Sequence, residues 1–142
     1  MRFNIGSHYK SFILLHLPVY IYAIGLFVLS SIPDLSPPDL GFQPQDKVYH
    51  FVFYASYAFF VARSFFAQSR WLRIKNSFVF YSIIFTALYG VSDEIHQYFV
   101  PGRVFSIFDI LANSLGAIAG TLIFYYYDRY KSRKTKLNKI SN

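Results

Sequence analysis

The stretch YGVSDEIHQYFVPGR, residues 89–103, decides how this chain folds, because it places a polar cluster between two strongly apolar runs. The polar side chains are those of Asp93, Glu94, His96, Gln97 and Arg103. The apolar segment before the cluster, residues 78–91, would span only about 21 Å as a helix. Crossing the hydrocarbon core of a bilayer takes about 30 Å. We therefore expect the helix to continue through the polar cluster until Pro101 and Gly102 end it.

The composition predicts lipid as the main solvent of this chain. Hydrophobic residues make up 54% of it and charged residues only 15%, and a soluble chain of 142 residues could not bury that much apolar surface. The chain has no cysteine, which excludes disulfides, thiolate metal sites, a cysteine nucleophile and cysteine-linked lipid anchors.

Four apolar runs predict an all-α, polytopic membrane protein, a bundle of four transmembrane helices in a single domain over residues 1–142. The predicted spans are about 11–32, 48–66, 77–100 and 107–127, followed by a basic tail over 128–142. A cleavable signal peptide is the alternative for the first run. That run is longer than the usual apolar core of a signal, and no A-x-A site follows it, so we expect a retained helix. The proline-rich segment 33–44 is predicted to be an exposed loop.

The basic residues predict the orientation. With four spans, twelve of the fourteen Lys and Arg fall on one side, and only Lys47 and Arg103 fall on the other. The positive-inside rule places the twelve in the cytoplasm together with both chain ends. Six of the seven acids fall on the opposite, outer side, with Asp128 the exception. The basic tail is interpreted as a topology signal that also touches anionic lipid, and nucleic-acid binding is not expected.

Three predicted helices carry polar residues spaced four apart near the outer side. The pairs are Asp46 and His50, Asp93 and Gln97, and Asp109 and Asn113. Residues four apart share one face of a helix. Polar groups at membrane depth normally face the interior of a bundle or a wet cavity. We therefore predict one polar pocket, lined by Asp46, Lys47, His50, Asp93, Glu94, Gln97, Arg103, Asp109 and Asn113.

Each polar residue of the pocket also has a structural interpretation. Asp46 is suited to cap the second span. Asp109 follows Ser106 at the spacing of a capping box, in which it would only satisfy backbone donors. Asn113 is suited to a hydrogen bond between helices. Taken together, the group favours function over packing.

Residues outside the predicted pocket have structural interpretations as well. Gly116 and Gly120 form a ridge of small residues, which indicates close helix packing rather than a ligand site. We expect His16 to form a hydrogen bond between helices, and we expect the side chain of His96 to face the lipid headgroups. Asp93 and Glu94 are about 100° apart on a helix, so we expect only one of them to face inward. We choose Asp93, because Gly90 and Gln97 share its face.

The ordered series of motifs resembles the VanZ-like family of small bacterial membrane proteins, named after a teicoplanin-resistance determinant. The resemblance covers about residues 20–125. Its motifs are Asp46-Lys47-x-x-His50, Asp93-Glu94-x-x-Gln97, Gly102-Arg103 and Asp109-x-x-x-Asn113, followed by Gly116. It implies a multi-pass protein of the bacterial cytoplasmic (inner) membrane linked to the cell envelope. It supplies no accepted reaction.

Three functions remain open. In the first, the chain is an envelope factor that affects susceptibility to teicoplanin more than to vancomycin. Teicoplanin carries an acyl chain and vancomycin does not. In that case Arg103, Lys47 and His50 would contact a lipid-linked or anionic envelope molecule. Alternatively it is an intramembrane enzyme acting on a lipid-linked phosphate or glycan, with His50 as general acid or base. A structural scaffold is the third interpretation, and transport is a weaker one because four spans are few.

The sequence predicts no cofactor. Carboxylates and a histidine suit a divalent metal such as Mg²⁺ or Zn²⁺, so a metal ion is left open, but a recognised spacing such as HExxH is absent. The sequence also lacks a glycine-rich phosphate loop and a G-x-S-x-G elbow. The lipid bilayer is the partner that the sequence predicts, and the oligomeric state is left open.

Overall fold

The computed structural model describes residues 5–35, 41 and 45–140. The part of the chain that it describes contains helices and no strand, which confirms the all-α prediction. The helices are α1 (Ile5–Ser30), α2 (Gln45–Ala67), α3 (Leu72–Asn76), α4 (Phe78–Gln97) and α5 (Ile107–Ile140).

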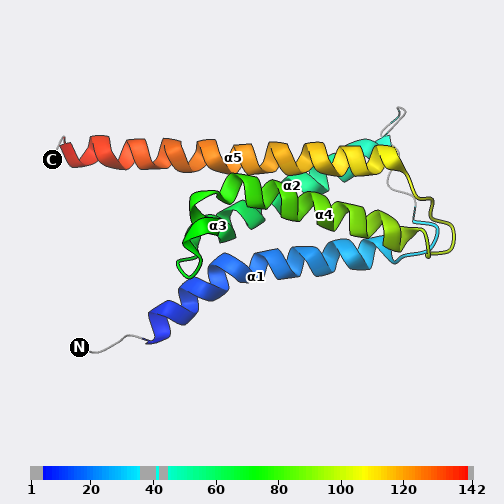
Figure 1. Cartoon of the computed structure of the whole chain (residues 1–142), viewed down its shortest axis with the longest axis horizontal. Coiled ribbons are helices and arrows are strands. Elements are labelled where there is room, and N and C mark those ends of the chain that lie inside the picture. Colours follow the sequence, from blue (N-terminus) through cyan, green and yellow to red (C-terminus); the bar gives the residue numbers. More distant parts are fainter. Residues whose placement is uncertain (1–4, 36–40, 42–44, 141–142) are drawn as a thin grey trace.

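The long helices α1, α2, α4 and α5 run side by side, and the short helix α3 connects α2 to α4 (Figure 1). We call one end of the molecule the loop end: α1 and α4 end there, and α2 and α5 begin there. The opposite end carries the start of α1 and the end of α5, and we call it the terminal end (Figure 1). The polar residues of the opening stretch therefore lie at the loop end.

Three helical segments of the described chain are long and apolar enough to cross a membrane. They are Phe12–Ser30, Phe78–Gln97 and Ile107–Lys139. Helix α2 falls outside this group. It packs against α1, α4 and α5, with Tyr54, Tyr57, Ala58 and Val61 all buried. The second of the four predicted spans, residues 48–66, therefore stays a prediction.

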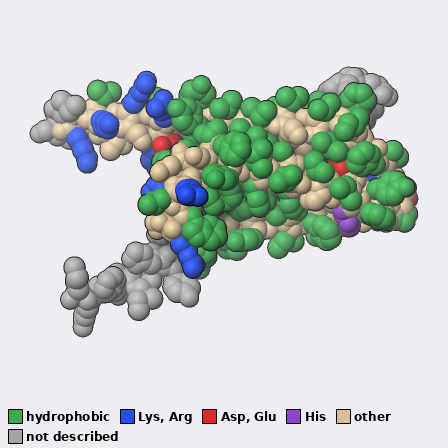
Figure 2. All heavy atoms as spheres, in the orientation of Figure 1, with side chains coloured by type: hydrophobic (Ala, Val, Ile, Leu, Met, Phe, Trp, Pro, Cys, Tyr) green, Lys and Arg blue, Asp and Glu red, His purple; other side chains and the backbone are tan. Residues whose placement is uncertain are grey.

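The outer surface of α1, α4 and α5 is apolar. Large side chains such as Ile24, Phe80, Leu88, Leu115 and Ile123 are exposed there, and hydrophobic groups cover the middle of the face shown in Figure 2. An apolar surface of this extent is typical of a protein whose solvent is lipid.

Helix α5 packs directly on the backbone of α2. A Cβ atom placed on Gly116 would lie 2.5 Å from the carbonyl oxygen of Phe51, and one on Gly120 would collide with the carbonyl of Ala55. Small residues allow two helix backbones to approach this closely. The interpretation of Gly116 and Gly120 as packing residues is confirmed.

Aromatic side chains fill the rest of the interior. Toward the terminal end, Phe78 and Phe124 are buried and lie edge to face with Phe66, with ring centroids 5.1–5.9 Å apart. Such pairs contribute about 0.5–1.5 kcal/mol each beyond the area they bury. This apolar layer separates the polar loop end from the basic terminal end.

Several helix ends differ from the predicted span ends, and helix α1, for example, begins at Ile5 instead of residue 11. Helix α4 ends at Gln97 rather than at residue 100, because a turn over 98–102 follows it, with Gly102 at φ 75°. Helix α5 extends to Ile140, well past the predicted end at residue 127. The basic tail is rich in Lys and Arg, which are good helix formers, so the helix continues beyond the apolar run.

Two further differences concern the connections. Helix α3 lies between the predicted spans 48–66 and 77–100, in a segment for which no helix was predicted. Most of the proline-rich loop, together with Asp39, lies outside the described residues.

Candidate functional site

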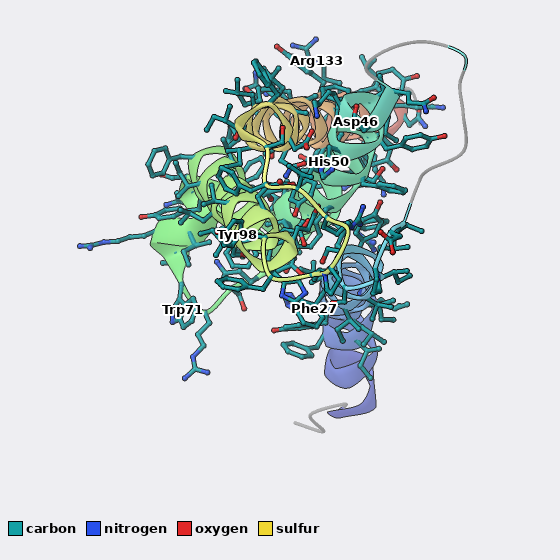
Figure 3. All side chains as sticks on the ribbon, turned by 90° about the vertical axis from the view of Figure 1, so that its right-hand side faces the viewer. Phe27, Asp46, His50, Trp71, Tyr98 and Arg133 are labelled. Atoms are coloured by element: carbon teal, nitrogen blue, oxygen red, sulfur yellow. The ribbon has the colours of Figure 1, made fainter. Side chains whose placement is uncertain are left out.

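All nine residues of the predicted pocket lie at the loop end. Helix α2 contributes Asp46, Lys47 and His50, and α4 contributes Asp93, Glu94 and Gln97. The segment before α5 contributes Arg103, and α5 itself contributes Asp109 and Asn113. Figure 3 looks onto this end, with Asp46 and His50 on α2, Tyr98 after α4 and Phe27 on α1. The polar stripes of three helices therefore converge, as their spacing predicts.

Lys47 connects α2 to α5 by ion pairs. Its ammonium lies 2.6 Å from Asp109 Oδ1 and 2.7 Å from Asp46 Oδ2. Burial favours the neutral form of the ammonium, but hydrogen bonds with Asp109 and Asp46 outweigh burial and raise the pKa of Lys47 above its ordinary value. Lys47 is therefore positively charged and held by two carboxylates.

Glu94 caps the start of α5. Its Oε2 accepts a hydrogen bond from the backbone N–H of Ser106, at 3.2 Å, while Ser106 Oγ accepts one from the N–H of Asp109, at 3.3 Å. The expected capping box paired Ser106 with Asp109, but the carboxylate of Asp109 turns to Lys47 instead. A residue of α4 thus completes the cap, because α4 and α5 meet at this end.

The expectation that only Asp93 faces inward is wrong, because both acids are buried. Asp93 is 7% exposed and Glu94 is 0% exposed. Helix α4 packs against neighbours on two sides, so two directions about 100° apart both point into protein. The shared face of Asp93 and Gln97 is confirmed, since Gln97 Nε2 donates to Asp93 Oδ2 at 3.3 Å.

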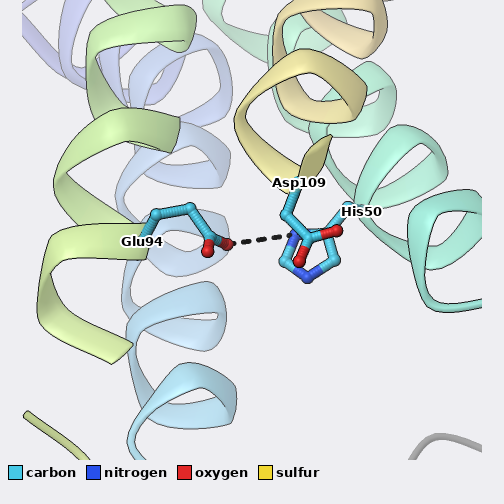
Figure 4. A group of neighbouring side chains, drawn as sticks. All are labelled: His50, Glu94 and Asp109. Atoms are coloured by element: carbon cyan, nitrogen blue, oxygen red, sulfur yellow. Dashed lines mark ion pairs between the residues drawn. The ribbon is translucent and has the colours of Figure 1, made fainter. Parts of the chain in front are cut away.

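His50 lies at the centre of the polar network. Its Nδ1 is 3.1 Å from Asn113 Oδ1 and 3.7 Å from Glu94 Oε1. Asn113 is fully buried, and its hydrogen bond joins α5 to α2, as its structural interpretation predicts. Figure 4 shows His50, Glu94 and Asp109 converging from α2, α4 and α5.

A cavity of about 240 Å³ lies beside His50. Its lining includes polar side chains, those of Ser30, Asp46, Tyr49, His50, Tyr54, Asp93, Gln97 and Arg103. It also includes apolar side chains, those of Leu26, Leu29, Leu35 and Phe53. The cavity thus offers both polar and apolar contacts, as sites for small molecules commonly do.

Arg103 is bound to the backbone of the chain itself. Its Nη1 donates to the carbonyl oxygen of Leu35 and its Nη2 to that of Leu29, both at 3.1 Å. The guanidinium thus fixes the segment before α5 onto the end of α1. Arg103 also lines the cavity, and its Nε has no hydrogen-bond partner among the described residues, so the predicted contact with an anion stays a prediction.

The charges of the site favour a cation over a free anion. Four carboxylates, those of Asp46, Asp93, Glu94 and Asp109, face two fixed cations, Lys47 and Arg103, and both cations are engaged by other groups. His50, Glu94 and Asp109 each offer one ligand atom, and these atoms lie within 4.8 Å of one another. This is the group of described residues that could hold a metal ion.

Tyr54 is a pocket residue that the sequence reasoning missed. It is 1% exposed, and its hydroxyl has no hydrogen-bond partner among the described residues. The signal was present, because Tyr54 follows Asp46 and His50 at the same spacing of four along α2. Aromatic residues make up 22% of the chain and are common in its apolar runs, which hides this signal.

Two histidines lie outside the cavity. His16 Nδ1 is 2.6 Å from Ser64 Oγ, which confirms the predicted hydrogen bond between helices. His96 does not face the headgroups as expected. It stacks on Phe27, with centroids 4.6 Å apart, and its Nε2 lies 2.9 Å from Ser31 Oγ. His96 therefore joins the end of α4 to the end of α1.

The comparison with protein families gives a match to the family described as VanZ/LLP1, over residues 7–128. The match covers most of α1 and α5 and all of α2, α3 and α4, and so includes every residue of the site. No curated protein and no solved structure matches this chain.

Proposed function

This chain belongs to the VanZ/LLP1 family, and from that membership we propose that it binds the head group of a lipid-linked envelope molecule. The cavity at the loop end is the binding site in this proposal, and it opens toward the outer leaflet. By binding there, the protein changes the access of acylated glycopeptides such as teicoplanin to that leaflet.

The observation that carries the proposal is the mixed polar and apolar lining of the cavity. His50, Asp93 and Gln97 offer hydrogen bonds, while Leu26 and Leu29 of α1 offer apolar contacts. Leu29 is itself 41% exposed, so the apolar lining continues onto the outer surface of α1. An amphiphile fits such a site, with its head on the polar side chains and its chain beside α1.

The distribution of charge supports the outer leaflet as the location. Lys and Arg side chains gather at the terminal end, as Figure 2 shows on one face, and the cavity lies at the opposite end. The positive-inside rule assigns the basic end to the cytoplasm. The cavity would then face the side on which glycopeptides act.

The test is expression in a glycopeptide-sensitive host, with the inhibitory concentrations of teicoplanin and vancomycin measured side by side. We expect the wild-type protein to raise tolerance to teicoplanin more than to vancomycin. Asp93→Asn should remove this difference, because it weakens a polar contact in the cavity. His96→Gln is the matched control, since it changes a polar residue of the same helix end that lies outside the cavity.

The proposal fails if tolerance to the two drugs rises equally or not at all while the protein accumulates in the membrane. It also fails if His96→Gln abolishes the difference as completely as Asp93→Asn does at equal protein levels. The polar residues would then serve packing alone, as in a structural scaffold.

One observation favours an enzyme as a second candidate. His50 lies on the cavity wall with the buried carboxylate of Glu94 3.7 Å behind it, an arrangement in which a carboxylate can orient a histidine that transfers protons. Incubation of the purified chain with a lipid-linked phosphate decides between the two. Product formation that His50→Gln abolishes supports the enzyme, whereas saturable binding without product supports a binding protein.

A further inference from the structure

Behind the cavity, His50, Glu94 and Asp109 bring one nitrogen and two carboxylate groups together from three different helices (Figure 4). We propose that these three residues bind a divalent transition-metal ion, with Zn²⁺ or Mn²⁺ as the fitting class. The proposal goes beyond the proposed function, because the ion can bind whether or not a lipid enters the cavity.

The first argument is the state of Glu94. The side chain is 0% exposed, and only Oε2 has a hydrogen-bond partner, the N–H of Ser106. The other oxygen, Oε1, has no hydrogen bond among the described residues and points at His50. A buried carboxylate oxygen without a partner is costly unless a cation compensates it. Glu94 thus has one structural oxygen and one oxygen free to ligate.

The second argument is the position of Lys47. Its ammonium lies 2.6 Å from Asp109 Oδ1, so a positive charge already occupies the place beside Asp109. The same ammonium lies 2.7 Å from Asp46 Oδ2, at the more exposed start of α2. When an ion binds Asp109, Lys47 can keep Asp46 as its partner. Lys47 therefore acts as the competitor that the metal ion displaces from Asp109.

The ligand set decides the class of metal. Mg²⁺ and Ca²⁺ prefer oxygen ligands alone, whereas a histidine nitrogen beside carboxylates suits Zn²⁺ and Mn²⁺. Three protein ligands leave at least one position open on the ion. Because His50 also lines the cavity, that open position lies on the side from which a phosphate oxygen could approach.

Asn113 contacts the same ring nitrogen of His50 that faces Glu94. It is fully buried on α5, and its Oδ1 lies 3.1 Å from His50 Nδ1, so this nitrogen gives up its hydrogen bond to Asn113 when it ligates an ion.

The experiment uses the full chain, purified in detergent, stripped with a chelator and titrated with Zn²⁺ or Mn²⁺ without added lipid. The readouts are metal content per chain and the thermal midpoint of unfolding. We expect one ion per chain and a midpoint that rises as the site saturates. Mg²⁺ at the same concentration should give neither effect. A wild-type chain that binds no stoichiometric ion overturns the proposal.

Variants then locate the ion. Glu94→Gln and Asp109→Asn keep the shape of the side chains and should abolish stoichiometric binding, because each removes a ligand carboxylate. His96→Gln, the control histidine at the same end, should bind as the wild type does. Binding that survives Glu94→Gln and Asp109→Asn, or that is lost in His96→Gln, contradicts the assignment.

Lys47→Met tests the proposal in the opposite direction, because it should strengthen Zn²⁺ binding rather than weaken it. Its result does not depend on whether the Glu94 and Asp109 variants fold. It removes the competing ammonium, so the chain should be less stable in chelator than the wild type and should bind Zn²⁺ more tightly. Added Zn²⁺ should restore its thermal midpoint. Equal or weaker Zn²⁺ binding by Lys47→Met would show that Lys47 does not compete for the site.

Discussion

At the scale of the residue, neighbouring positions on one helix have separate roles. Glu94 caps α5 through one oxygen and leaves the other beside His50. Asp93, next to it in sequence, faces the cavity and pairs with Gln97. The spacing of four revealed Asp93 and Gln97, because both belong to one face of one helix. It could not reveal the role of Glu94, which depends on a partner twelve residues away, at the start of another helix.

Arg103 gives the prediction at this scale. Replacing it with Lys keeps the charge but loses the planar fork that reaches the carbonyl oxygens of Leu29 and Leu35 together. We expect Arg103→Lys to cost about 1.5 kcal/mol, the lower value for a hydrogen bond to a charged group. Denaturation in detergent measures the loss, and hydrogen exchange should rise at the end of α1.

Arg133→Lys is the control for this change, since Arg133 is exposed on the final turns of α5. It should leave both stability and exchange as in the wild type. If the two substitutions behave alike, Arg103 does not fasten the segment before α5 to α1.

At the scale of the element, apolar runs in the sequence predicted most of the helices. Contacts between helices and the local turns decided the remaining helix ends and buried residues. Runs of apolar residues located α1, α4 and the apolar part of α5 within a few residues, because lipid demands long apolar helices. The end of α4 at Gln97 and the length of α5 were missed, since a turn and a run of helix-forming bases set them. The buried Tyr54 shares the spacing of four with Asp46 and His50, but the many aromatic residues of the apolar runs hide this signal.

Gly120 gives the prediction at this scale. In Gly120→Ala the added Cβ would meet the backbone carbonyl of Ala55, which has no flexible side chain to move aside. We expect α5 to shift from α2 at a cost of about 1–3 kcal/mol. Thermal unfolding in detergent and protein accumulation in the membrane should both report the loss.

Gly25→Ala is the matched control, because a Cβ at Gly25 would meet nothing within 4 Å. Alanine favours the helix by about 1 kcal/mol relative to glycine, so this variant should be as stable as the wild type or more stable. Equal losses in the two variants would mean that the close approach of α5 and α2 does not explain Gly120.

At the scale of the whole molecule, the chain separates its charges by the length of its helices. Carboxylates and His50 meet at the loop end, and aromatic residues fill the middle. Lys and Arg side chains gather at the terminal end (Figure 2). The sequence predicted this separation through the count of bases on each side. It also predicted that the polar groups converge. It could not predict which carboxylate pairs with which cation, because those pairs join different helices.

The number of crossings is the prediction that belongs to this scale. Since the chain has no cysteine, single cysteines can report sidedness without background labelling. Phe99→Cys reports the loop end, and Trp71→Cys and Lys134→Cys report the terminal end; all three positions are exposed. With four crossings, a membrane-impermeant maleimide added to intact cells should label Phe99→Cys alone. The other two should react only after the membrane is opened.

With three crossings, α2 would stay on one side of the membrane and the pattern would invert. Trp71→Cys and Lys134→Cys would then react in intact cells, and Phe99→Cys would be protected, if the chain start remains in the cytoplasm. That result would place Glu94 and Asp109 on the cytoplasmic side and His50, which lies on α2, on the outer side. Neither the site for an outer-leaflet molecule nor the metal site of His50, Glu94 and Asp109 could then form, because both need α2 to pack against α4 and α5 as it does in the structure.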